Sequence, residues 1–126
     1  MLGKIDYAMV NVSDMARSVA FYRDVLGVPL RFESPGWSEF DTATTTLALH
    51  MASAPAPAPS HGPAAGTCTL GFSVDDLDAT VASLQARGAV FVMPPTTQAE
   101  EGIRLAVLVD PDGLAISFAQ TLPREG

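Results

Sequence analysis

Few side chains in this sequence have the chemistry to hold a metal ion or to transfer a proton. The chain contains two histidines, His50 and His61, and one cysteine, Cys68. A catalytic divalent ion generally needs about three protein ligands, from His and carboxylates for the harder metals. His61 lies in a Pro-rich segment, which leaves His50 as the one good ligand, and acid–base chemistry at His50 would need a partner such as Tyr7. Metal chemistry is therefore disfavoured, and no cofactor is predicted.

Composition and charge exclude several classes of function. The 126 residues are 48% hydrophobic and 17% charged, which is typical of a globular domain with a buried core. The net charge of −7 and the pI near 4.5 argue against binding nucleic acid or an anionic membrane surface. No signal peptide is evident, no apolar run approaches the ~18 residues of a membrane span, and a single cysteine suits a reducing compartment. One cytoplasmic domain is therefore expected.

The elements that must position these side chains occur twice in the chain. When residues 7–33 are moved forward by 62 positions, they fall on residues 69–95 and similar residues coincide. The coinciding pairs are Val12 with Val74, Asp14 with Asp76, Met15 with Leu77, Ser18 with Thr80, Val19 with Val81 and Tyr22 with Leu84. A self-match at a fixed offset indicates a duplicated unit, and each copy reads as a strand, an Asp-capped helix and a strand.

The first copy begins with a strand over residues 5–12, whose predicted core side is formed by Ile5, Ala8, Val10 and Val12. Ser13 or Asp14 caps the helix that follows, and Gly27 ends it in a left-handed conformation. Three further strands are predicted, over residues 29–33, 37–41 and 45–51.

The second copy repeats this plan. Its predicted elements are a strand over residues 67–74, a helix over 77–86 ended by Gly88, a strand over 89–93, and a hairpin of strands 103–109 and 114–119. Asp-Pro-Asp-Gly at residues 110–113 is a strong turn signal for that hairpin. Residues 94–102 are predicted to be a loop, and the Pro/Ala-rich residues 53–66 a semi-extended linker. The fold class is therefore α+β, with tandem βαβββ modules over residues 1–52 and 67–121.

These motifs together resemble the vicinal oxygen chelate superfamily, which includes glyoxalase I, extradiol dioxygenases, and bleomycin- and fosfomycin-resistance proteins. The resemblance rests on the paired modules, on V-S-D-x-x-x-S-x-x-F-Y-x-x-x-L-G from Val12 to Gly27, and on D-P-D-G followed by a strand. It covers about the whole chain. It implies that the sheets curl into a cup with the helices outside, and that the protein is a homodimer.

The resemblance also indicates where a metal would be held. Members that use a metal place ligands at four positions on the inner face of the cup, and these positions correspond here to Tyr7, His50, Thr69 and Ser117. Only His50 is a good ligand, because the hydroxyls of Tyr, Thr and Ser are poor neutral donors. Recruiting Glu39 and Asp41 beside His50 would be a new arrangement.

Alternation along the strands predicts which other residues line this face. If His50 points inward, so do Thr46, Ala48, Tyr7, Met9 and Asn11 in the first module, and Thr69, Gly71, Ser73, Ala115, Ser117 and Ala119 in the second. Trp37 joins the first set if its strand continues the pattern. A roomy concavity with an aromatic plate and a few polar groups suits an organic ligand.

Simpler roles remain open for several of these residues. Trp37 could cover a strand edge, His50 could be a hydrogen-bonded wall residue, and the Tyr7 hydroxyl could donate to a neighbouring carbonyl. Arg104 is predicted to face the cup or its rim, where it would pair with an anionic ligand or with Glu100 or Glu101. Cys68 is out of phase with the inward positions, so a buried, unreactive side chain is predicted.

The leading hypothesis is a metal-independent binding protein of the bleomycin-resistance type, which holds an aromatic or amphipathic organic molecule. The predicted ligand-binding residues are Tyr7, Met9, Trp37, His50, Thr69, Arg104 and Ser117. Two alternatives remain: a lyase, isomerase or dioxygenase of the same superfamily, and a domain with a vestigial site that dimerises or docks a partner.

Overall fold

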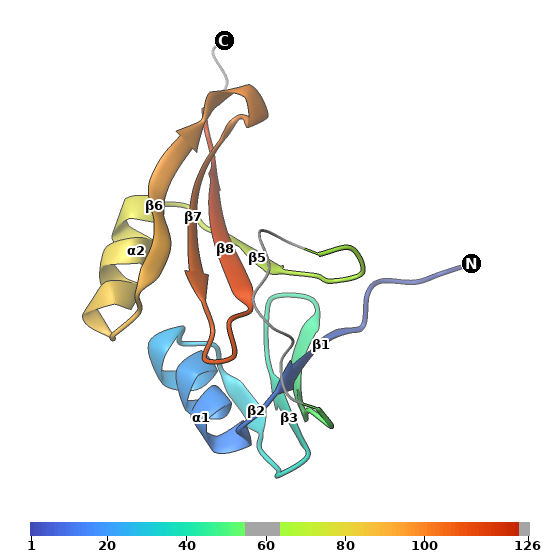
Figure 1. Cartoon of the computed structure of the whole chain (residues 1–126). Helices are drawn as coiled ribbons and strands as arrows, with labels where there is room; N and C mark the ends of the chain where they lie inside the picture. Colours follow the sequence, from blue (N-terminus) through green and yellow to red (C-terminus); the bar gives the residue numbers. More distant parts are fainter. Residues whose placement is uncertain (55–63, 124–126) are drawn as a thin grey trace. The chain divides into compact units, whose positions relative to one another are not determined.

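The computed structural model describes residues 1–54 and 64–123 of the chain (Figure 1). The chain forms two compact units, Met1–Ala58 and Pro59–Gly126, and each contains one four-stranded sheet. Most of the predicted linker, residues 55–63, lies outside the described residues, and so does His61.

The first unit builds its sheet in the order β1-β4-β3-β2, with β1 parallel to β4 and the other neighbours antiparallel. Its elements are β1 (Tyr7–Val12), α1 (Met15–Ala20), the π-helical turn η1 (Phe21–Val25), β2 (Leu30–Phe32), β3 (Trp37–Phe40) and β4 (Thr46–Met51). Helix α1 packs against β4. The strands predicted for this unit are therefore all present, each slightly shorter than expected.

The helix of the first unit begins and ends where the sequence indicates. The Asp14 side chain accepts a 3.0 Å hydrogen bond from the backbone N–H of Arg17, which satisfies one of the unpaired donors of the first turn. Gly27, with φ of 75°, leads the chain out of the helical segment. Val19 and Tyr22 are buried on the side that faces the sheet.

The prediction that Ile5 belongs to the core is wrong. Ile5 is 74% exposed, because β1 begins only at Tyr7. Within β1 the alternation holds, since Val10 and Val12 are buried whereas Tyr7 and Met9 are exposed. The core side of the strand is therefore set by its second half.

The second unit has the same topology, with the strand order β5-β8-β7-β6 and β5 parallel to β8. Its elements are β5 (Leu70–Ser73), α2 (Leu77–Ala86), β6 (Phe91–Gln98), the 3-10 turn η2 (Ala99–Glu101), β7 (Ile103–Val109) and β8 (Ala115–Thr121). Each sheet remains open at its edges. The structure confirms the predicted α+β fold.

Helix α2 packs against β6, β7 and β8 of this second sheet (Figure 1). The Asp76 side chain caps it by accepting from the backbone N–H of Ala79 at 3.1 Å, at the position that the duplication predicts. The Phe72 and Phe118 rings stack beneath the helix at 5.7 Å between centroids. No helix in residues 1–54 or 64–123 has both the length and the apolar character needed to cross a membrane.

The prediction of a loop over residues 94–102 is wrong. Strand β6 continues through Pro94 and Pro95 to Gln98, and η2 follows. Proline is tolerated here because β6 is an edge strand, whose outer N–H groups need no partner in the sheet. The register with β7 also shifts between Met93 and Thr96, which accommodates the two prolines as an irregularity in the ladder.

Candidate functional site

The aromatic, charged and imidazole side chains of the first unit gather on the face of its sheet opposite α1. In the register of β1, β4 and β3, Asn11 aligns with His50 and His50 with Trp37, while Met9 aligns with Ala48 and Ala48 with Glu39. Leu47, Leu49 and Phe40 alternate with these residues and are buried on the α1 side. We call this face the aromatic face, and define it by Tyr7, Met9, Asn11, Arg31, Trp37, Glu39, Asp41, Thr46, Ala48 and His50.

Three rings meet on the aromatic face. The Tyr7 and Trp37 rings lie 5.8 Å apart between centroids at 76°, and the Trp37 and His50 rings lie 6.2 Å apart at 72°. Because Tyr7 aligns with Thr46 and Trp37 with His50, the contact between the two larger rings crosses β4 at Ala48. A small residue at that point lets side chains from strands on either side of β4 touch.

His50 is the imidazole of this group and is exposed. Its Nδ1 lies 3.3 Å from Oδ1 of Asn11, which is directly opposite on β1. In the tautomer that donates from Nδ1 to the amide oxygen, Nε2 carries the lone pair and can accept a hydrogen bond. The ring can therefore offer a neutral acceptor beside the Trp37 indole.

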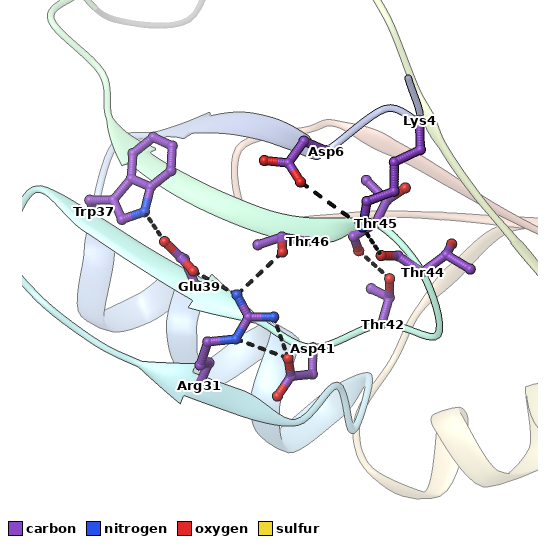
Figure 2. A network of polar contacts seen from close by, with 10 residues as sticks. All are labelled: Lys4, Asp6, Arg31, Trp37, Glu39, Asp41, Thr42, Thr44, Thr45 and Thr46. Carbon is purple, nitrogen blue, oxygen red and sulfur yellow. Dashed lines mark hydrogen bonds and ion pairs between the residues drawn. The ribbon is translucent and has the colours of Figure 1, made fainter. Parts of the chain in front are cut away.

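A polar network holds the indole in place (Figure 2). Trp37 Nε1 donates to Glu39 Oε2 at 2.8 Å, and Arg31 Nη1 donates to Glu39 Oε1 at 2.7 Å. Arg31 also donates to Asp41 Oδ1, from Nε at 2.9 Å and from Nη2, and to Thr46 Oγ1 from Nη1 at 3.2 Å. These contacts join β2, β3 and β4 across the aromatic face.

Electrostatics in the network follow from these contacts. The pKa of Glu39 lies below its ordinary value, chiefly because the Trp37 N–H donates to the carboxylate and then because Arg31 does. The pKa of Arg31 is raised, first by its hydrogen bond to Asp41 and then by that to Glu39. Both effects favour the charged forms, so the ion pair persists at neutral pH.

The second sheet presents a different surface on the side away from α2. Gly71 aligns with Ser117 and Ser73 with Ala119 in the parallel pairing of β5 and β8. A methyl group at Gly71 would lie 3.2 Å from Ser117 Oγ, which shows that these positions share one face. Ser117 Oγ lies 3.4 Å from the Leu70 carbonyl oxygen, a long hydrogen bond that leaves the hydroxyl weakly held. On β5 and β8 this face has small residues, as the alternation predicts, whereas β7 adds Leu105, Val107 and Val109 to it.

Arg104 does not take the predicted position. It lies two and four residues before Ala106 and Leu108 in β7, so it shares their face, which is the face covered by α2. Its Nη1 donates to Asp78 Oδ2 at 2.6 Å, in the first turn of α2. The predicted partners Glu100 and Glu101 were wrong because η2 follows the longer β6 and the helix supplies a closer carboxylate.

Cys68 also departs from its prediction. It is exposed, because β5 begins only at Leu70 and the residues before it lie outside the sheet. Alternation from Thr69 therefore carries no information about where Cys68 points.

The residues at the four metal positions of the resembled family do not fit a divalent ion. Tyr7 packs its ring on Trp37, and Thr69 and Ser117 offer only neutral hydroxyls. Both carboxylate oxygens of Glu39 already accept a hydrogen bond, one from Trp37 and one from Arg31, so neither is free to act as a metal ligand. In the part of the chain that the structure describes, no three His, Cys, Asp or Glu side chains gather into a metal-binding group.

Arg31 is the residue of the site that sequence reasoning missed. The available signal was its place in a strand one turn away from Glu39 and Asp41, since neighbouring antiparallel strands put like-facing charges side by side. The register of β2 with β3 shifts between Leu30 and Phe32, so pairing by simple counting would not have identified the partners.

Known proteins share both the sequence pattern and this fold. A family model for the Glyoxalase/Bleomycin resistance protein/Dioxygenase superfamily matches residues 4–118. The uncharacterised protein YaeR from Escherichia coli (strain K12) is 33% identical, over 94% of this chain and 98% of its own length. The lactoylglutathione lyase from Haemophilus influenzae is 28% identical, over 93% of this chain and 92% of its own length.

Solved structures agree with the sequence matches on the fold. The crystal structure of a glyoxalase/bleomycin resistance protein/dioxygenase from Nocardioides superposes with a TM-score of 0.77 at 24% identity, covering all of this chain and 91% of that one. The resemblance inferred from the duplicated motifs is therefore confirmed, and the chain belongs to the glyoxalase/bleomycin resistance protein/dioxygenase superfamily.

Proposed function

We propose that this protein binds a small organic molecule on the aromatic face without a metal ion, in the manner of a bleomycin-resistance-type binding protein. The observation that supports this most directly is the contact of the Trp37 indole with the rings of Tyr7 and His50 on one face of the sheet. Tyr7 is 53% exposed and Met9 45% exposed, so the face offers apolar area to a ligand. Aromatic faces with a few polar groups are typical of such sites.

The fixed orientation of the Trp37 indole also favours ligand binding. Ordering a rotamer-rich side chain on binding costs about 0.5–1.5 kcal/mol, and a ring that is already held avoids that cost. The indole of Trp37 is held by Glu39, which is held in turn by Arg31. A ligand would therefore meet an indole already fixed in orientation.

Polar contacts would come from groups with hydrogen-bonding capacity to spare. Nε2 of His50 can accept, and the hydroxyl of Tyr7 can donate or accept. Met9 would supply an adaptable apolar contact, while Thr69 and Ser117 belong to the second unit and stay predictions of the sequence. Arg104 is not included among the ligand contacts, because its guanidinium already donates to Asp78.

Fluorescence of Trp37 tests this proposal, since it is the only tryptophan in the chain. We expect bleomycin, or another drug-sized aromatic compound from a panel, to change the emission saturably at concentrations below about a millimolar. Calorimetric titration should then show weaker binding by Trp37→Leu and Tyr7→Leu, by about 5–10-fold each. Phe91→Leu is the control, because the Phe91 ring packs on Phe118 in the second unit, whereas the Trp37 ring packs on Tyr7 and His50. An emission that no compound alters would refute the proposal.

A second candidate function is a lyase reaction, favoured by the 28% identity to a lactoylglutathione lyase over nearly the whole chain. His50 would act as the general base or acid with Tyr7 nearby. The discriminating measurements are elemental analysis of protein purified without chelator and formation of lactoylglutathione from methylglyoxal and glutathione. A stoichiometric metal ion that disappears in His50→Ala, with turnover, would replace the binding proposal with this one.

The proposal includes a homodimer, as the resemblance to the superfamily implies, and a cytoplasmic location. Sedimentation equilibrium tests this part independently of ligand binding. A dimer that binds no compound would instead favour the third hypothesis, a vestigial site on a dimerisation domain.

A further inference from the structure

The charges of the aromatic face limit which ligands it can accept. Arg31 is the one cation among its ten residues, and four hydrogen bonds to protein oxygens already engage its guanidinium. A guanidinium has five N–H donors, so a single N–H of Arg31 remains for anything else. An anionic ligand would have to displace Asp41 or Glu39 to gain a bidentate contact with Arg31.

Two further basic side chains, Lys4 and Arg23, are already engaged by protein oxygens. Lys4, before β1, lies 4.0 Å from Asp6 and donates to a backbone carbonyl. Arg23 is paired with Asp24 on η1 at 2.8 Å. On the face of the second sheet away from α2, β5 and β8 contribute Gly71, Ser73, Ala115, Ser117 and Ala119, none of which is charged.

The balance on the aromatic face is negative. Glu39 and Asp41 share the one guanidinium, which leaves an excess of one carboxylate charge. The faces of the Trp37 and Tyr7 rings add the negative side of their quadrupoles, which attracts a cation within about 6 Å. The chain as a whole carries a net charge of −7, which raises the local concentration of cationic molecules and lowers that of anionic ones.

We infer that the ligand of the aromatic face is a cationic aromatic or alkylammonium compound. Carboxylates are excluded, because the guanidinium of Arg31 is already paired with Glu39 and Asp41. This inference rests on the proposed function and specifies its substrate class. The ammonium group lies beside Trp37 and the carboxylates, and the apolar part of the ligand lies on Tyr7 and Met9. Cations with an aromatic body gain from both features, whereas neutral analogues gain only from the rings.

Three probes of matched shape test it: phenethylamine, which is a cation at neutral pH, 2-phenylethanol, which is neutral, and 3-phenylpropionate, an anion. Titrations are followed by the single indole N–H resonance of Trp37 in a nitrogen–proton correlation spectrum, and by calorimetry. We expect the amine to bind about fivefold more tightly than the alcohol at low salt, from ion–ring and ion–carboxylate attraction. The carboxylate should bind more weakly than the alcohol, and added salt should reduce the differences.

Charge variants separate the carboxylates of the aromatic face from the net charge of the protein. Asp41→Asn keeps an acceptor for Arg31 but removes the excess charge, so the preference for the amine should fall about threefold. Asp24→Asn makes the same change in net charge at another Arg-paired carboxylate, on η1, and should leave the preference unchanged.

The outcomes distinguish failure of the cationic assignment from failure of the proposed small-molecule binding. Equal affinity for the three probes, or tightest binding of 3-phenylpropionate, would overturn the cationic assignment while leaving a small-molecule site on the aromatic face. A shift in preference of equal size in Asp24→Asn and Asp41→Asn would also overturn it, because net charge alone would then explain the selectivity. If none of the probes and none of the drug-sized compounds binds, the proposed function fails and the assignment fails with it.

Discussion

The ring contact between Tyr7 and Trp37 should be measurable as a coupling energy. Edge-to-face aromatic pairs contribute about 0.5–1.5 kcal/mol beyond the area they bury. This pair, at 5.8 Å and 76°, has that geometry, but Tyr7 is 53% exposed, which places the expected value in the lower half of the range. A double-mutant cycle of Tyr7→Leu and Trp37→Leu should therefore give a coupling of about 0.5–1 kcal/mol in the free energy of unfolding.

The assay is urea denaturation of the four proteins in the cycle, followed by circular dichroism because two of them lack the only tryptophan. The cycle cancels the loss of the Trp37–Glu39 hydrogen bond, since that loss occurs whether or not Tyr7 is present. A second cycle of Trp37→Leu with Phe91→Leu serves as the control. It should be additive, because the Phe91 ring packs on Phe118 in the second unit and not on the rings around Trp37.

A result would refute the reasoning if the Tyr7–Trp37 coupling fell within the additivity error of about 0.3 kcal/mol. The two rings would then be mobile in solution, and the aromatic face would not be a preformed surface. The preorganisation argument for ligand binding would lose its basis, although the fold would be unaffected.

Three further predictions concern the turn, the network and the second sheet. Asp110→Ala removes the acceptor of two backbone N–H groups, at 2.9 and 2.8 Å, and should lower the free energy of unfolding by about 2–4 kcal/mol in urea, with Asp110→Asn losing less. Because the pKa of Glu39 is depressed, its stabilising contribution is present at neutral pH and is lost as the pH falls through that lowered value, so the Trp37 emission should change below the ordinary pKa of a glutamate. That change should be missing in Glu39→Gln, and a midpoint at or above the ordinary pKa would contradict the assignment. Gly71→Ala should lower the free energy of unfolding by no more than about 1 kcal/mol in urea, because the new methyl group lies 3.2 Å from Ser117 Oγ, a hydroxyl held only by a long hydrogen bond; a larger loss would show that this hydroxyl cannot move aside.

Local chemistry explains why much of the fold could be predicted. Asp14 and Asp76 begin their helices because a carboxylate before an apolar periodic run satisfies free N–H groups wherever it occurs. Gly113 lies in the turn at φ of 89°, as its place in Asp-Pro-Asp-Gly requires. Such signals depend on residues within a few positions of one another, so they can be interpreted without knowing how the strands pair.

The predictions that were wrong depended on contacts between residues far apart in the sequence. Arg104 was assigned to the wrong partner because Asp78 is distant in sequence and becomes close only when α2 packs on the sheet. The continuation of β6 through Pro94 and Pro95 depends on its being an edge strand, which the strand order decides. In both cases the neighbouring residues in the sequence do not indicate what lies next to the segment in the folded protein.

For the site, the sequence by itself determined the duplicated modules, the shared face of Tyr7, Met9 and His50 once their strands pair, and the poverty of metal ligands. Only the tertiary structure brought Arg31 to Glu39 and Asp41, and the ring of Trp37 to that of Tyr7 across β4. The reason is that alternation fixes on which side of its own strand a residue lies. Strand order and register, including the shift beside Phe32, decide which residues of other strands it meets.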